Sequence, residues 1–412
     1  MLYLFTKMAS KTFFNIKQLL SLQGVEQKNG RFITKDDLGI YENCYLVTEN
    51  GHVKEIGCGK YPVSDENIDM DSTVVLPAFV DSHTHITFLG SRAGEFEMRS
   101  EGKTYIDIAK AGGGIISTVN KTRNASLEEL YNASINNINR LKSFGVGVIE
   151  AKTGYGLDEA SEMKQLEAIN MAKKQNPFII PTFLGAHDIP PGTGDKERRK
   201  KDFIDTIINK MIPDIGNKKL AKFCDVFVED GYYTRDEAKT ILNHGKRFGL
   251  IPKLHVDEFT NQEGATLAVE LGAASADHLL CISKDGIDAI SSSDTVACML
   301  PGTSFNLGLP YAPAKKLVEA GACLAIGSDF NPGSNNCLNM QLIMTIAITQ
   351  MKLSVAQAIS AACYGGAKSL MLEKDFGSLS KGKKALFQSY KVGTYQDIFY
   401  NYGENHLKKI FI

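Results

Sequence analysis

Eight short β-prone runs recur between residues 74 and 329, and patterns typical of helices lie between them. The runs span residues 74–85, 145–152, 178–184, 223–229, 252–257, 274–278, 295–300 and 323–329. Helical patterns cover 126–144, which opens with the cap-like Ser126-Leu127-Glu128-Glu129, and also 158–174 and 234–248. This alternation predicts an α/β fold, a parallel (β/α)8 barrel of the TIM type.

Both ends of the chain have a different texture from the middle. Residues 12–76 alternate short β-prone runs with turns, and Glu49-Asn50-Gly51 joins two of them as in a β-hairpin. Short strand-like runs return from 377 to 412. We therefore expect a small β-sandwich-like domain built from residues 1–75 and 373–412, flanking a barrel formed by residues 76–372.

Composition excludes some classes of partner. The chain has 46 Lys and Arg against 47 Asp and Glu, and this near balance gives no support to a nucleic-acid partner. No uninterrupted apolar run approaches the roughly 20 residues of a membrane helix, so no membrane association is expected. The eight cysteines include no Cys-x-x-Cys pair, which favours the cytoplasm. The basic N-terminal segment argues against a targeting peptide, because its apolar stretch is short. Met8 is an alternative initiating methionine.

The first β-prone run ends in His83 and His85, which are separated by one residue. Alternate residues of a strand face the same side, so the two imidazoles would point in one direction. Parallel α/β folds place their chemistry at the carboxyl ends of strands. The pair is therefore half of a metal site that needs partners from other strand ends.

Those partners follow other β-prone runs. His187, His255, His278 and Asp329 lie at or near their ends and would converge on one rim of a barrel. Two imidazoles from the first strand, His255 and the Asp329 carboxylate suit one divalent or trivalent ion, Zn or Fe, with a position left for water. Such a water loses its proton near neutral pH and becomes a nucleophile.

Other polar residues near this rim have two interpretations each. His278 would stabilise charge developing on a carbonyl oxygen, or be structural. Glu258 would take a proton from the activated water, or be a solvated loop carboxylate. His187 is a candidate substrate contact, and Asp329 would pass the proton to a leaving nitrogen.

Three further features concern anions. Arg92 would clamp a substrate carboxylate, or be a surface residue. The loop from Asn331 to Ser334 would grip a small anion with its N–H groups and hydroxyl, or be a tight turn. Gly112-Gly113-Gly114 predicts a backbone turn, since no Walker pattern follows it.

At this point the chain resembles the imidazolonepropionase family of metal-dependent amidohydrolases. The matching stretches are Asp81-Ser82-His83-Thr84-His85, Ala111-Gly112-Gly113-Gly114-Ile115, Thr153-Gly154-Tyr155-Gly156-Leu157, Phe183-Leu184-Gly185-Ala186-His187, His255-Val256-Asp257-Glu258, the run from Glu270 to Leu279, Leu300-Pro301-Gly302 and Ser328-Asp329-Phe330-Asn331-Pro332-Gly333. They lie within residues 40 to 395. The chain departs from the family pattern at Ala78 and Leu386 and in its early end at Ile412.

The resemblance implies hydrolysis of 4-imidazolone-5-propanoate to N-formimidoyl-L-glutamate, and similar proteins are commonly homodimers. It implies that the metal ligands are His83, His85, His255 and Asp329. It also implies catalytic roles for Glu258 and His278, and contacts with substrate or product by Arg92, Tyr155, His187, Glu258, Asn331, Gly333 and Ser334.

Three rival readings remain. A binuclear amidohydrolase would need a carbamylated lysine at the end of the fourth strand, where Val228-Glu229-Asp230 stands; Lys152 belongs to the second. A deaminase of a cyclic base would have the same histidines, but it would not need Arg92, which indicates a substrate with a carboxylate tail. A non-catalytic scaffold would usually lack ligands that are all present here.

Overall fold

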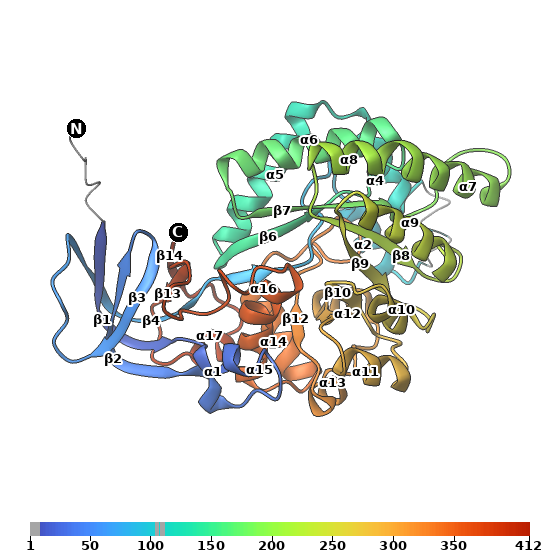
Figure 1. The fold of residues 1–412 in the computed structure, drawn as a ribbon. Coiled ribbons are helices and arrows are strands. Elements are labelled where there is room, and N and C mark those ends of the chain that lie inside the picture. Colours follow the sequence, from blue (N-terminus) through green and yellow to red (C-terminus); the bar gives the residue numbers. More distant parts are fainter. Residues whose placement is uncertain (1–8, 104–106, 108–111) are drawn as a thin grey trace.

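The computed structural model describes residues 9–103, 107 and 112–412, and it contains two sheets (Figure 1). The larger sheet has eight strands in sequential order, and neighbouring strands pair in parallel. These strands are β5 (Phe79–Asp81), β6 (Val146–Lys152), β7 (Ile179–Ala186), β8 (Phe223–Val228), β9 (Ile251–Val256), β10 (Ser275–His278), β11 (Val296–Met299) and β12 (Leu324–Ile326). The expected (β/α)8 barrel is thereby confirmed.

The ring closes beyond the ends of its first and last strands. The N–H of Asp329 donates to the carbonyl of His83 at 2.9 Å, and the N–H of His85 donates to the carbonyl of Phe330 at 2.9 Å. A parallel bridge joins Thr84 to Phe330. The backbone that joins β12 to β5 therefore also carries three of the candidate metal ligands and holds them in a fixed register.

The first predicted strand is in fact two, so the range 74–85 is wrong. Residues up to 77 belong to β4 (Glu66–Pro77) of the second sheet, and the barrel strand begins at Phe79. The Ala78 N–H donates to the carbonyl of Leu386, whereas the Phe79 N–H donates to the carbonyl of Gly145 in the barrel. The chain changes sheets across one residue, and an apolar run buried in both sheets does not reveal it.

Helices cover the outside of the barrel (Figure 1). Among the barrel connections the structure describes α2 (Ala93–Ser100), α4 (Ile115–Asn124), α5 (Leu127–Lys142), α6 (Glu159–Gln175), α7 (Lys196–Thr206), a π-helical turn (Ile207–Met211), α8 (Ile212–Lys218), α9 (Arg235–Arg247), α10 (Gly264–Glu270), α11 (Lys284–Ser291), α12 (Pro301–Leu307) and α13 (Ala314–Ala320). After β12 come α14 (Met340–Gln350), α15 (Val355–Ser360), a second π-helical turn (Ala361–Gly365) and α16 (Gly366–Ser369).

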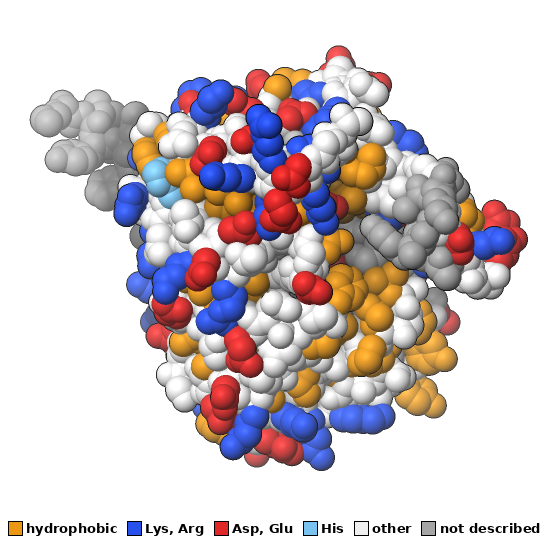
Figure 2. Space-filling model, turned by 90° about the vertical axis from the view of Figure 1, so that its right-hand side faces the viewer, with side chains coloured by type: hydrophobic (Ala, Val, Ile, Leu, Met, Phe, Trp, Pro, Cys, Tyr) orange, Lys and Arg blue, Asp and Glu red, His pale blue; other side chains and the backbone are white. Residues whose placement is uncertain are grey.

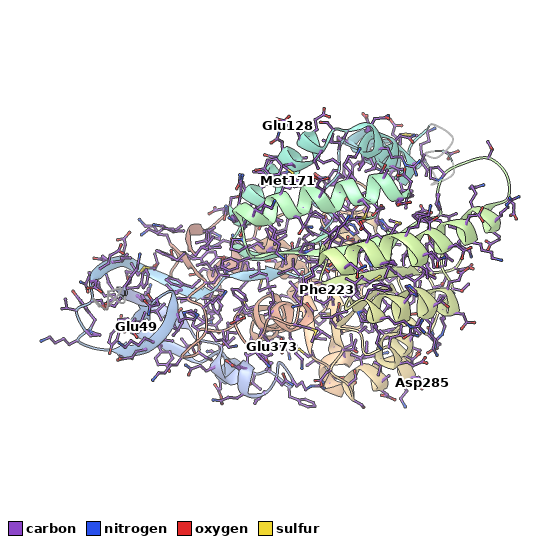
Figure 3. The ribbon with its side chains drawn as sticks, turned by 45° about the horizontal axis from the view of Figure 1, so that its top comes forward. Glu49, Glu128, Met171, Phe223, Asp285 and Glu373 are labelled. Carbon is purple, nitrogen blue, oxygen red and sulfur yellow. The ribbon has the colours of Figure 1, made fainter. Side chains whose placement is uncertain are left out.

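The helix starts follow simple capping chemistry. The Ser126 hydroxyl accepts the N–H of Glu129, and the Glu129 carboxylate accepts the N–H of Ser126, which is the capping box seen in the sequence. Figure 3 shows Glu128 and Met171 on the neighbouring helices α5 and α6 of this outer layer, with Phe223 at the start of β8. None of the described helices combines the length and apolarity needed to cross a membrane.

The second sheet is built from both ends of the chain and lies beside the barrel (Figure 1). Its order is β14-β13-β4-β1-β2-β3, from β1 (Ser10–Leu20), β2 (Ile40–Glu49), β3 (His52–Cys58), β4, β13 (Phe387–Tyr390) and β14 (Leu407–Phe411). Only β1 and β4 pair in parallel. The predicted hairpin is present, since Asn50 and Gly51 both have positive φ, at 52° and 76°. The short helices α1 (Gln23–Gln27), η1 (Lys35–Leu38) and α17 (Asp397–Tyr400) complete these ends.

Candidate active site

A cavity of about 510 Å³, including its open mouth, lies at the carboxyl ends of the barrel strands. Most of the residues singled out in the sequence line it: His85, Arg92, Tyr155, His187, His255, Glu258, His278, Asp329, Asn331 and Ser334. His83 is fully buried beside them. The barrel thus brings together residues that are up to 249 positions apart in the chain, from His85 to Ser334.

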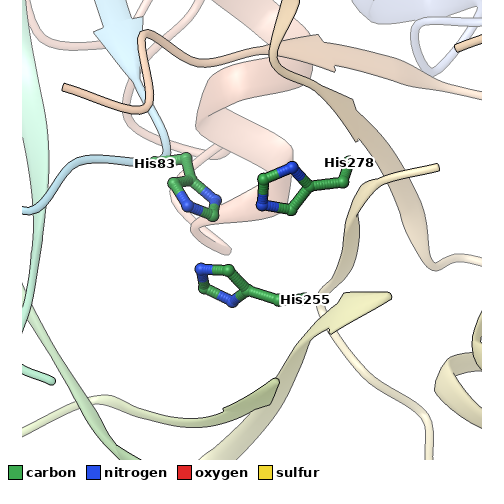
Figure 4. Close-up of side chains that lie close together, drawn as sticks. All are labelled: His83, His255 and His278. Atoms are coloured by element: carbon green, nitrogen blue, oxygen red, sulfur yellow. The ribbon is translucent and has the colours of Figure 1, made fainter. Parts of the chain in front are cut away.

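Two groups of possible metal ligands meet at His83. Donor atoms of His83, His85 and Asp329 lie within 4.8 Å of one another, as do those of His83, His255 and His278 (Figure 4). Nε2 of His83 and Nε2 of His85 lie 3.6 and 3.5 Å from the same Asp329 oxygen. The four ligands named from the sequence therefore occupy two overlapping groups.

The histidine nitrogens at this point lack other partners. Among the described residues, Nε2 of His83 and Nε2 of His255 are buried without a hydrogen bond. A buried polar atom left unpaired costs about 1–3 kcal/mol, so such atoms normally have a partner. A metal ion would satisfy both nitrogens, and the donor set suits one.

Two carboxylates that the sequence reasoning missed face the other side of these rings. Oδ2 of Asp277 lies 2.6 Å from Nδ1 of His83, and Oδ2 of Asp225 lies 3.1 Å from Nδ1 of His255. The Asp277 carboxylate hydrogen-bonds Nδ1 of His83, which holds the proton there and leaves Nε2 free to bind a metal. Asp225 lies beside Nδ1 of His255 but makes no hydrogen bond with it in the described structure. For Asp225 a signal was available in the sequence, since this aspartate interrupts the otherwise apolar strand β8.

Below the histidines lies a buried charge cluster formed by Glu150, Lys152, Asp225, Lys253 and Asp277. Nζ of Lys152 lies 2.7 Å from Asp225, 3.1 Å from Glu150 and 3.6 Å from Asp277. Nζ of Lys253 lies 2.9 Å from Glu150. Burial alone would lower the pKa of Lys152, but the three carboxylates raise it above its usual value. The lysine is therefore an ammonium ion, which argues against its carbamylation.

Glu258 and His278 face each other at the cavity wall. Nδ1 of His278 lies 3.4 Å from Oε1 of Glu258. Burial raises the pKa of Glu258 well above its usual value, and the charges of Asp329 and Glu229 add to this effect. Burial, followed by the charge of His255, lowers the pKa of His278. The raised pKa makes the Glu258 carboxylate a stronger base, and the lowered pKa favours the neutral imidazole of His278.

His187 and Tyr155 form an aromatic wall beside His85. The ring of His187 stacks on that of His85 with centroids 5.1 Å apart, and its Nδ1 lies 3.0 Å from the carbonyl of Gly154. Burial lowers the pKa of His187 to about 4, so its imidazole is neutral at pH 7. The Tyr155 ring lies 5.7 Å from the His85 ring. Both residues lie where a substrate contact was expected.

The loop from Asn331 to Ser334 was expected to bind an anion with its backbone N–H groups, and this expectation is wrong. The N–H groups of Gly333 and Ser334 both donate to Oδ1 of Asn331, at 2.8 and 2.7 Å. The same side chain donates through Nδ2 to Oδ1 of Asp329 at 3.0 Å. The loop is thus a tight turn that braces Asp329, and its hydroxyl on Ser334 lies 3.3 Å from Oδ2 of Asp329.

Comparisons with known proteins agree with this geometry. A family model described as Amidohydrolase family matches residues 193–412. The chain is 38% identical over 403 residues to an imidazolonepropionase of Clostridium tetani, covering 96% of this chain and 95% of that protein. It is also 38% identical over 406 residues to an imidazolonepropionase of Thermoanaerobacter pseudethanolicus, covering 98% and 96%.

Solved structures share the fold at low identity. An adenosine deaminase from Xanthomonas campestris with bound zinc superposes with a TM-score of 0.72 at 14% identity, covering 98% of this chain and 92% of that one. A triazine hydrolase variant gives 0.73 at 11% identity, covering 98% and 93%. Given its matches to curated relatives over nearly their whole length, the chain belongs to the imidazolonepropionase family of amidohydrolases.

Proposed function

We propose that this protein opens the lactam ring of 4-imidazolone-5-propanoate with one water molecule and releases N-formimidoyl-L-glutamate. The observation that carries the proposal is that two groups of close donor atoms, one of His83, His85 and Asp329 and one of His83, His255 and His278, lie at a cavity that Arg92 also lines. A base deaminase shares the first feature, but its substrates have no carboxylate tail to meet an arginine.

One metal ion, Zn or Fe, fits among His83, His85, His255 and Asp329. The unpaired Nε2 atoms of His83 and His255 support this assignment, as do the carboxylates behind both rings. An ion bound there would acidify a water molecule and polarise the substrate carbonyl.

Glu258 and His278 are placed to handle protons and charge. Glu258 takes a proton from the attacking water, which its raised pKa favours. His278 stabilises the oxygen of the opening carbonyl by a hydrogen bond. The proton then moves from Glu258 to Asp329, which passes it to the ring nitrogen as the C–N bond breaks, so the nitrogen leaves as a neutral amidine.

The remaining residues position the substrate. The planar ring lies against His187 and Tyr155, while Arg92, Asn331 and Ser334 bound the side of the cavity that receives the propionate tail, and Gly333 lines the adjoining hollow. The eight cysteines are all free, which supports a cytoplasmic location.

Incubation with freshly made imidazolonepropionate, followed by mass spectrometry, tests the function. We expect formimidoylglutamate without release of ammonia, together with close to one equivalent of metal per chain in elemental analysis. His255→Ala should abolish both product formation and metal binding, whereas His52→Ala on the exposed edge of the small sheet should change neither. Ammonia release instead would favour a deaminase, and a metal-free protein without turnover would favour a scaffold.

A further inference from the structure

Outside the metal cavity lies a second hollow, here called the vestibule. It shares Arg92, His187 and Ser334 with the metal cavity and extends outward to Arg99 and Lys103. Its empty space, including its open mouth, is about 1030 Å³. Figure 2 shows hydrophobic side chains gathered on this face of the molecule. The vestibule therefore adjoins the metal cavity.

The charge of Arg92 is already balanced inside the protein. Its Nε and Nη2 atoms donate to the two oxygens of Glu95 at 2.9 and 2.7 Å, which is the two-pronged geometry of an arginine–carboxylate pair. Glu95 is buried and also accepts the N–H of Gly114 at 2.9 Å. A carboxylate that approaches Arg92 finds only the N–H groups of Nη1 and the second N–H of Nη2, and it also meets the negative charge of Glu95.

Arg99 supplies the charge that Arg92 lacks. It follows Glu95 by four residues on α2, so both side chains project from the same face of the helix. Its Nη2 lies 3.4 Å from the carbonyl oxygen of Gly333. Within the described part of the chain, no carboxylate lies within 4 Å of its guanidinium nitrogens. This cation is half-buried, and among the described residues its hydrogen bond goes to a carbonyl, while the Glu95 charge acts on it from a greater distance.

Gly333 brings the two arginines together. A Cβ atom added there would lie 2.2 Å from Nη1 of Arg92, so that guanidinium packs directly on the glycine. Arg99 reaches the carbonyl of the same residue. Nη1 of Arg92 and the guanidinium of Arg99 thus lie on either side of one residue, at the boundary between the vestibule and the metal cavity.

We infer that Arg99 is a specificity-determining residue, which together with Nη1 of Arg92 selects substrates that carry a carboxylate tail. The inference rests on the proposed function and names the group that reads the propionate end of that substrate. Glu95 sets the geometry of Arg92, and Arg99 provides the net positive charge that a carboxylate needs.

Steady-state kinetics on two substrates test this role. The acid and the methyl ester of imidazolonepropionate differ only in the charge of the tail. Arg99→Gln should raise KM for the acid about 10- to 50-fold, as for loss of one charged hydrogen bond, and leave kcat within about twofold. It should leave the ester unchanged. Arg99→Lys should restore part of the loss, since it keeps the charge but not the planar fork.

The control is Arg247→Gln, at the exposed C-terminal end of α9, which should alter neither substrate. Equal losses of Arg99→Gln on acid and ester would overturn the inference, because a merely structural role affects both. If the wild type opens neither compound, the proposed function fails. Calorimetric binding of glutarate, expected to be weaker in Arg99→Gln, would then still decide the role of Arg99; equal binding would reject it.

Discussion

Nδ1 of His83 lies 2.6 Å from Oδ2 of Asp277, and both side chains are fully buried. The two residues are 194 positions apart and belong to opposite parts of the barrel sequence. This contact sets which nitrogen of His83 carries the proton, and so leaves Nε2 directed at Asp329. A carboxylate that never touches the substrate thus decides whether His83 can act as a ligand.

Asp277→Asn should weaken metal binding about 10- to 100-fold, since the amide no longer holds the Nδ1 proton as a carboxylate does. Competition with a chromophoric chelator measures this affinity directly and does not depend on turnover. Asp294→Asn is the matched control, because the Asp294 side chain is 91% exposed. Unchanged affinity in Asp277→Asn would show that His83 is oriented by other contacts.

Lys152→Met should lower the free energy of unfolding by about 3–5 kcal/mol, because it leaves the buried Asp225 carboxylate without its lysine, whereas Glu150 and Asp277 keep Lys253 nearby. Nζ of Lys152 contacts Glu150, Asp225 and Asp277, and all four side chains are inaccessible to solvent. Guanidinium denaturation provides the measurement. Lys218→Met removes an exposed ion pair with Asp214 and should change the value by less than about 1 kcal/mol. Similar values for the two variants would contradict the argument.

Sequence patterns predicted the parts of the fold in which each strand is apolar along its length. The ranges 223–229 and 252–257 agree with β8 and β9 to within one residue. His83, His85 and His255 could be found because strand ends in a barrel share one rim. Regular β12, by contrast, ends at Ile326, since the N–H of Ser328 turns to the Asp81 carboxylate.

The rest of the site depends on contacts between distant strands. Asp225 and Asp277 meet at Lys152 only after the barrel closes, so no spacing in the sequence indicates their partners. The ion pair between Arg92 and Glu95 was easier to predict from the sequence, because Glu95 follows Arg92 by three residues. Spacing alone could not tell that this pair leaves Arg99 as the open cation.

A pH-dependent contact joins the two ends of the chain at Glu26. Burial alone would raise its pKa, but hydrogen bonds from Ser380 and Ser378 and the charge of Lys383 hold the pKa below its usual value. The carboxylate therefore stabilises the fold above its unfolded-state pKa of 4.5, and this contribution disappears as the pH falls through the lower folded-state value.

Glu26→Gln should accordingly cost about 1 kcal/mol at pH 7, and its difference from the wild type should shrink below pH 4.5. Denaturation curves across this pH range measure it, with Glu128→Gln on the outer face of α5 as the surface control. A difference that stays constant down to pH 3 would mean that hydrogen bonding, and not charge, supplies the stabilisation.

Gly333→Ala should impair substrate binding without unfolding the protein. The new Cβ would lie 2.2 Å from Nη1 of Arg92 and 2.8 Å from Cζ, and the three atoms it approaches most closely all belong to this one flexible side chain. Arg92 must therefore move while the loop backbone stays, so KM for the acid substrate should rise about 10-fold and the melting temperature should hold. Gly94→Ala, in the same helix as Arg99, meets no atom within 4 Å and should leave KM unchanged.

The effects of Gly333→Ala and Arg92→Lys should also be less than additive, because both act through one guanidinium. If the two effects on KM were fully additive, Gly333 would not act through the guanidinium of Arg92.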